Sequence, residues 1–123
     1  MAYLAVALGG ALGAMARYGL SGWVQHLSGS FFPVGTLAVN VLGSFIIGLL
    51  LQMTTGRFVW SVEARLLLTT GFCGSLTTFS TFSYETLALM EDQQWLAAGG
   101  NTLLNVLVCL AATGLGLAAG RLV

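Results

Sequence analysis

The 123-residue sequence contains no lysine, and charged residues of all kinds make up only 7% of it. Soluble globular domains carry about 25% charged residues, so this composition argues against a soluble domain and excludes a disordered chain. The four arginines balance the four acidic residues, and a net charge of zero offers no basis for binding nucleic acid. With 57% hydrophobic residues and a mean hydropathy of +0.92, the chain is expected to lie in a lipid bilayer.

Cysteine is also scarce, and neither copy is placed as a metal ligand or a disulfide partner would be. Cys73 and Cys109 lie in apolar stretches without CxxC spacing or a neighbouring histidine. Both are interpreted as small apolar packing residues. The sequence contains no catalytic triad, metal-ligand cluster or phosphate-binding loop, so the chain is not expected to be an enzyme.

Four apolar stretches are long enough to cross a bilayer, which takes about 20 helical residues. Their approximate bounds are 2–24, 34–53, 62–90 and 95–122. The only proline, Pro33, precedes the second stretch, where its fixed φ and missing N–H suit a helix start. The first stretch lacks a basic segment before it and is interpreted as a retained helix, not a signal peptide. The expected fold is an all-α membrane protein with one four-helix transmembrane domain.

Charge placement bears on orientation in the membrane. Four spans put both termini on one side, together with Arg57, Arg65 and Arg121, whereas the other side has at most Arg17. This bias is too weak to determine the orientation by the positive-inside rule, and insertion in both orientations is compatible with the sequence.

Glycine is abundant, at 17 residues, and two pairs are spaced four apart. Gly9 with Gly13, and Gly116 with Gly120, place small residues on one helix face and so allow close approach of another helix. This spacing favours a tightly packed bundle. Because four short helices alone can hardly enclose a pathway, an oligomer with a second copy is expected.

Polar residues follow two of the predicted helices at intervals of four. Asn40 and Ser44 lie in the second span, and Asn101, Asn105, Cys109 and Thr113 lie in the fourth. Residues spaced by four share one face of a helix. Such a stripe either joins helices by hydrogen bonds or lines a water-filled path, and the spacing alone leaves both interpretations open.

The third span contains features that weaken a helix. Gly71 and Gly74 each cost about 1 kcal/mol relative to alanine in a helix. The hydroxyl residues that follow are Ser75, Thr77, Thr78, Ser80, Thr81 and Ser83. Broken backbone at membrane depth is tolerated only where it is buried in protein or lines a cavity. A break is expected between Gly74 and Thr78, with carbonyl oxygens available to a cation and hydroxyls to an anion.

Phe79 and Phe82 lie on one face of the helix that resumes after this break. They either pack against lipid and core or present the positive edges of their rings to an anion. Arg17 either extends to an interface, neutralises a helix terminus, or attracts anions into a vestibule. Acidic residues occur only near span ends, which gives little support to a proton relay.

Three segments together resemble the Fluc (CrcB) family of fluoride channels. They are GFCGSLTTFSTFSYE at 71–85, GTLAVNVLGSFIIG at 35–48 and GGALGAMARYGL at 9–20. The resemblance implies a four-span subunit of an antiparallel, dual-topology homodimer in the bacterial plasma (inner) membrane. It also implies a third helix broken near the membrane centre, and passive export of fluoride that confers resistance to fluoride toxicity.

The resemblance also assigns roles to residues of this chain. One sodium ion at the two-fold axis would be bound by the backbone carbonyls of Gly74 and Thr77. The fluoride pathway would comprise Asn40, Phe79, Ser80, Phe82, Asn105, Cys109 and Thr113, with Arg17 matching a basic position of the first helix. Family members often carry serine in the fourth-helix track, where this chain has Asn105 and Cys109.

Two other functions are compatible with a small four-span protein. A dual-topology exporter of cationic drugs has a similar length, but it requires a carboxylate in the first span, where this chain has only Arg17. A non-transporting scaffold would use the polar stripes only to join helices. Neither alternative accounts for the glycine, hydroxyl and phenylalanine pattern of the third span.

Overall fold

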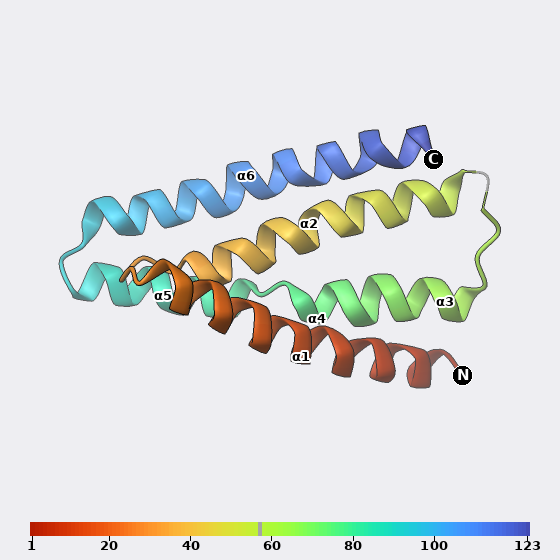
Figure 1. Ribbon diagram of the computed structural model, residues 1–123, viewed down its shortest axis with the longest axis horizontal. Coiled ribbons are helices and arrows are strands. Elements are labelled where there is room, and N and C mark those ends of the chain that lie inside the picture. The colour runs from red at the N-terminus through yellow and green to blue at the C-terminus, as the bar shows by residue number, and fades with distance from the viewer. Residues whose placement is uncertain (57) are drawn as a thin grey trace.

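The structure is a computed structural model that describes residues 1–56 and 58–123, so Arg57 lies outside the described residues. The described chain is helical with short connections, which confirms the all-α prediction. The elements are α1 (Ala2–Ser28), α2 (Val34–Thr55), α3 (Val62–Leu66), the π-helix η1 (Leu67–Cys73), α4 (Gly74–Leu76), α5 (Phe79–Glu91) and α6 (Trp95–Leu122). In Figure 1 the elements α3 to α5 follow one another along one line beside α1, α2 and α6, and both termini lie at the same end.

Three of these helices, α1, α2 and α6, are long and apolar enough to cross a membrane. They contain the predicted spans 2–24, 34–53 and 95–122. The remaining predicted span, 62–90, is assembled from the shorter elements α3, η1, α4 and α5. Its π-helix was not expected from the sequence; π-helical turns are rare and occur frequently at functional sites.

Local sequence explains where several helices begin and end. Gly29 ends α1 in the left-handed conformation at φ 58°, which glycine adopts without the steric cost of a Cβ. Pro33 immediately precedes α2, as expected from its sequence. Ser61 caps α3, because its side-chain oxygen accepts a hydrogen bond from the backbone N–H of Ala64 at 3.1 Å.

The first glycine pair lets α1 lie directly on the π-helix. A Cβ built on Gly9 would overlap the carbonyl oxygen of Leu67, and one on Gly13 would overlap that of Phe72. Gly71 faces back toward Gly9, whose Cα would lie 2.9 Å from an added Cβ. Small residues therefore bring two backbones together, as predicted, and they do so within one chain.

The second glycine pair lets α6 lie on α2, the most extensive helix contact in the described chain. A Cβ on Gly116 would overlap the carbonyl of Phe45, and Gly120 also faces α2. Gly48 of α2 in turn lies against the backbone of Thr113. Both glycine pairs thus serve packing between helices of one chain.

Helical geometry is interrupted between α4 and α5. Thr77 has ψ 157° and Thr78 has φ −150° and ψ 120°, so both are extended. Gly74, at φ −62° and ψ −30°, is helical. The break predicted between Gly74 and Thr78 therefore consists of two extended threonines at its C-terminal end. Gly71 instead serves close packing against α1, and Gly74 lies at an open surface.

Candidate ion pathway

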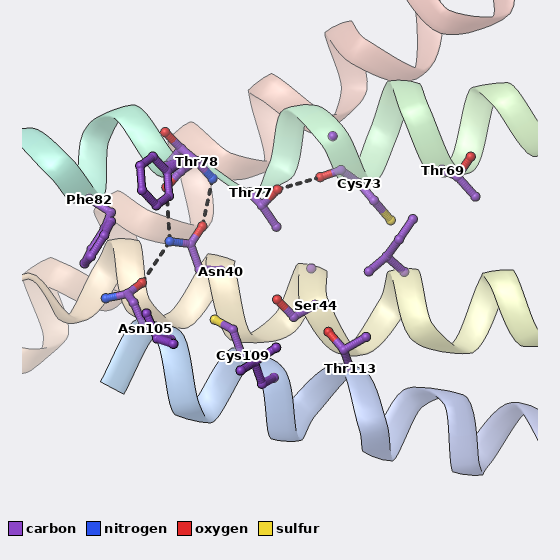
Figure 2. A pocket seen from close by; sticks show the side chains of 16 residues that line it. Asn40, Ser44, Thr69, Cys73, Thr77, Thr78, Phe82, Asn105, Cys109 and Thr113 are labelled. Carbon is purple, nitrogen blue, oxygen red and sulfur yellow. Dashed lines mark hydrogen bonds between the residues drawn. The ribbon is translucent and has the colours of Figure 1, made fainter. Parts of the chain in front are cut away.

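A cavity of about 520 Å³ lies beside the extended threonines, between α2, the α3-to-α5 segment and α6. Most of the site residues predicted from the sequence line it: Asn40, Gly74, Thr77, Phe79, Phe82, Asn105, Cys109 and Thr113. Figure 2 shows the side chains of Asn40, Thr77 and Asn105 coming from three separate parts of the chain. The tertiary structure thus brings the predicted site residues together around one cavity.

The side chain of Asn40 forms hydrogen bonds to both the N–H and the C=O of the extended residue Thr78. Its Oδ1 accepts a hydrogen bond from the N–H of Thr78 at 2.7 Å, and its Nδ2 donates to the carbonyl oxygen of Thr78 at 3.1 Å. Figure 2 shows both bonds as dashed lines. Both side chains are buried, so these bonds satisfy groups that the helical ladder no longer pairs.

The hydroxyl of Thr78 begins the next helix. Its Oγ1 accepts a hydrogen bond from the backbone N–H of Thr81 at 3.2 Å, which caps α5. The same hydroxyl donates to the hydroxyl oxygen of Thr81 at 3.1 Å. Thr78 is therefore bound to Asn40 through its backbone and to α5 through its side chain.

A chain of buried amides continues from Asn40 across the bundle. Asn40 Nδ2 donates to Asn105 Oδ1 at 2.9 Å, and Asn105 Nδ2 donates to Asn101 Oδ1 at 3.0 Å. Asn101 then donates to the hydroxyl of Thr86, which donates to the carbonyl of Phe82 at 2.8 Å. This half of the polar stripe joins α2, α5 and α6 by hydrogen bonds.

The two phenylalanines of α5 lie close together at the edge of the cavity. Their ring centroids are 5.4 Å apart with an interplanar angle of 59°. Phe82 is buried at 7% exposure, whereas Phe79 is 77% exposed. The tilted pair therefore extends from the interior of the chain to an exposed face.

Two predicted site residues lie outside this cavity. Ser80 is exposed, with its hydroxyl oxygen 3.3 Å from that of Thr78. Arg17 lines a second hollow of about 370 Å³, together with Ser21, Thr36 and Thr81. Thr78 lines both hollows and so lies between them.

A carboxylate lies one turn beyond Phe82 on α5. Glu85 Oε1 accepts a hydrogen bond from the hydroxyl of Thr36 at 2.7 Å, and its Oε2 is buried without a partner among the described residues. Glu85 lines neither hollow. Its bond to Thr36 joins α5 to α2 near the end of the predicted span.

The carbonyl groups predicted to bind sodium lie around the end of α4. In the described part of the chain, no backbone N–H outside the regular helices donates to the carbonyl of Gly74 or Thr77. Gly74 is exposed, and the nearest atom to an added Cβ would be 3.9 Å away. Both carbonyls belong to residues that line the cavity, which is compatible with a carbonyl-bound cation.

Thr78, Ser44 and Cys73 also line the cavity, although none of them was predicted as a pathway residue. The sequence placed Thr78 only among the hydroxyls near the break, although a threonine directly before an apolar helix is also a recognisable N-cap. It placed Ser44 in a polar stripe whose role, joining helices or lining a path, stayed open. Nothing in the sequence separates Cys73 from an ordinary packing residue.

Comparison with known proteins identifies the family of this chain. The family model described as CrcB-like protein, Camphor Resistance (CrcB), matches residues 4–117. A relative from Geobacter metallireducens is 52% identical over 118 residues, covering 96% of this chain and 95% of its own. One from Geotalea daltonii is 54% identical over 112 residues, covering 91% and 90%. Both are named fluoride-specific ion channel FluC. With a family match along most of its length and relatives about half identical to it, this chain belongs to the CrcB family.

Proposed function

We propose that this chain is the subunit of a fluoride-specific ion channel that lets fluoride leave the cytoplasm passively. The observation that carries the proposal is the extended Thr77–Thr78 backbone held by Asn40 beside a cavity lined by Phe79 and Phe82. Family membership and the names of the relatives support the same ion. The chain is a multi-pass membrane protein and not an enzyme.

The cavity offers the kinds of contact that a small, strongly hydrated anion requires. Fluoride gives up hydrogen bonds to water when it enters, so the wall must supply donors in their place. Hydroxyls are available from α2 and α6, and the ring edges of Phe79 and Phe82 carry partial positive charge. Carboxylates, which would repel an anion, are missing from the described lining.

The proposed assembly is an antiparallel homodimer whose subunits insert in opposite orientations. Phe79 lines the cavity yet is 77% exposed in the single chain, and a second copy packed on this face would cover it. The arginine bias is too weak to impose one orientation. The interruption at Thr77 and Thr78 would then lie near the membrane centre, where protein on both sides shields it from lipid.

A sodium ion is proposed at the two-fold axis, held by the carbonyl oxygens of Gly74 and Thr77 from both subunits. Main-chain carbonyls suit a hard cation, and those of Gly74 and Thr77 lack backbone donors outside the regular helices. When bound, sodium would supply positive potential near the pathway and a link between subunits. The residues of this chain would provide the ligands and, through Asn40, the backbone conformation that presents them.

The proposed location is the bacterial plasma (inner) membrane, and the proposed role is resistance to fluoride. Hydrogen fluoride crosses lipid as a neutral weak acid and dissociates in the more alkaline cytoplasm. A membrane potential that is negative inside favours exit of the anion by about 2.3 kcal/mol per 100 mV. Passive conduction is therefore sufficient for export.

The test is fluoride efflux from liposomes containing the purified protein, with the voltage set by a potassium ionophore. Rapid release of fluoride with little release of chloride is expected. Comparable chloride release would exclude fluoride selectivity. Absence of fluoride release, with export of a cationic dye against its gradient, would favour a drug exporter, although α1 carries no carboxylate.

A further inference from the structure

The π-helix η1 changes which residues of the third predicted span share a face. The backbone N–H of Gly74 donates to the carbonyl of Thr69, five residues earlier, as well as to that of Gly71. In an α-helix, residues five apart lie about 140° apart around the axis. A turn closed by a bond over five residues places them nearly in line instead. Thr69 and Gly74 accordingly line the same cavity.

The glycine pair of α1 fits this longer turn. Gly9 and Gly13 are four residues apart, which is about one turn of α1. They face the carbonyls of Leu67 and Phe72, which are five residues apart. If η1 were α-helical, the carbonyl one turn after that of Leu67 would belong to Gly71. The spacing of this contact therefore matches a π-turn of η1 against an α-turn of α1.

Gly9 lies against the π-turn itself. A Cβ built on Gly9 would overlap the carbonyl oxygen of Leu67 and lie 3.0 Å from the backbone nitrogen of Phe72. These are the two atoms that a hydrogen bond over five residues joins. Gly71 faces α1 in return, since its own added Cβ would lie 2.8 Å from the carbonyl oxygen of Val6. Backbone meets backbone in this contact, so a methyl group at Gly9 must shift α1, the π-turn or both.

On the cavity side of the same segment, the carbonyl of Gly74 lacks its helical donor. In a continuing α-helix this carbonyl would accept a hydrogen bond from the N–H of Thr78, four residues later. That N–H donates to Oδ1 of Asn40 instead, at 2.7 Å. The carbonyl without its helical donor thus belongs to the residue that the π-turn aligns with Thr69 at the cavity.

We propose that Gly9 and Gly13 are positioning residues for the cation site, because they hold η1 in its π-helical form and so keep Gly74 at the cavity. The inference rests on the proposed sodium site and extends it to residues of α1 that lie outside the cavity. If η1 became α-helical, Gly74 would turn away from Thr69, toward a position about 140° around the axis. The carbonyl of Thr77, which follows in the same segment, would be displaced with it.

The test measures how much sodium is needed to stabilise the protein in detergent, with sodium replacing potassium at constant ionic strength. Gly9→Ala and Gly13→Ala are expected to lower the unfolding midpoint in potassium. They should also raise the sodium concentration for half-maximal stabilisation about tenfold, as for loss of one interaction with an ion. Gly116→Ala is the matched control, because its Cβ would overlap the carbonyl of Phe45 in the same way, but between α6 and α2. It is expected to lower the midpoint in potassium and keep the wild-type sodium requirement.

A milder substitution carries the test if neither Gly9→Ala nor Gly13→Ala folds. A Cβ on Gly10 would lie 3.3 Å from Oγ of Ser75, which belongs to α4. Gly10→Ala therefore presses on the same segment through a side chain and should raise the sodium requirement to a smaller degree. Gly19→Ala, with no atom near its added Cβ, should leave the requirement unchanged.

Three results would contradict this role of α1. A wild-type sodium requirement in every folded variant at Gly9, Gly10 and Gly13 would overturn this inference alone and reduce the contact to packing. An equal rise in Gly116→Ala would also overturn it, because general destabilisation would then be the cause. A wild-type midpoint independent of the cation would remove the sodium site and this inference together. Fluoride efflux from liposomes tests the proposed channel function separately from all three.

Discussion

The side chain of Asn40 hydrogen-bonds to both backbone polar groups of Thr78, with Oδ1 2.7 Å from its nitrogen and Nδ2 3.1 Å from its oxygen. One amide therefore replaces the two ladder bonds that an extended residue loses inside a helical rod. An amide carries a donor and an acceptor on two adjacent atoms and so matches this pair, whereas an ionised carboxylate offers no donor. Much of the candidate site depends on this contact.

Replacing Asn40 by leucine, which has a similar size and no polar atoms, should destabilise the extended segment. The unpaired N–H and C=O of Thr78 would each cost about 1–3 kcal/mol. We expect a lower midpoint of thermal unfolding in detergent, together with loss of fluoride efflux. Asn40→Asp keeps the acceptor for the Thr78 N–H but turns a carboxylate oxygen toward the carbonyl oxygen of Thr78 and Oδ1 of Asn105, so it should also lower the midpoint. Equal midpoints for wild type and Asn40→Leu would contradict this account.

Replacing Phe79 or Phe82 by isoleucine should slow fluoride efflux while leaving the protein folded. Isoleucine is apolar but has no ring edge, and ring interactions are worth about 0.5–1.5 kcal/mol. Phe82→Ile should also lower stability, because Phe82 is buried, whereas the single chain leaves Phe79 exposed. Exposed Phe58 provides a control in the α2–α3 connection, where the same substitution should change nothing. Unchanged efflux in both variants would reduce the pair to packing.

Replacing Gly13 by valine should separate α1 from the π-helix. Any Cβ at this position would overlap the backbone of Phe72, and overpacking of this kind costs about 1–3 kcal/mol. Gly19 lies in the same helix with no atom near its added Cβ, so Gly19→Val is the matched control. Thermal unfolding in detergent should distinguish the two. An equal loss of stability in both variants would point to helix propensity as the cause.

Replacing Cys109 by serine should increase fluoride efflux. A hydroxyl is a stronger hydrogen-bond donor than a thiol, and Cys109 lines the cavity. Cys109→Val, similar in size and without a donor, should decrease it. The measurement is the initial rate of efflux at low fluoride concentration. Identical rates in the two variants would mean that this side chain does not contact the ion.

Sodium should stabilise the assembled protein more than potassium does. A ligand that binds only the folded state raises its stability with increasing concentration, and the proposed site is made of carbonyls around Gly74 and Thr77. We therefore expect the unfolding midpoint in detergent to rise when sodium replaces potassium at constant ionic strength. Lithium serves as a second control for size. A midpoint independent of the cation would remove the proposed sodium site.

The sequence alone is sufficient to predict the fold class and the helix faces that carry most of the candidate site. Low charge and four apolar stretches are sufficient for an all-helical membrane protein, because a bilayer leaves the backbone few ways to pair its polar groups. The spacing of four also placed Asn40, Asn105, Cys109 and Thr113 on candidate faces, and they share a cavity. Phe79 and Phe82, three residues apart, were also predicted to share a helix face, and their rings lie close together.

Only the tertiary structure decided how these parts are used. The glycines indicated that the third predicted span would be interrupted, and the structure shows that the extended residues are Thr77 and Thr78. Thr78 can be extended there because Asn40 of α2 forms hydrogen bonds with both its N–H and its C=O. From the sequence, the polar stripe of α6 could either join helices by hydrogen bonds or line a path. In the structure, different residues of the stripe do each of these. Asn105 is bonded across helices, whereas Thr113 faces the cavity unbonded among the described residues. Periodicity identifies the face on which a side chain lies, and only a neighbouring helix can determine whether its hydrogen bonds are already used.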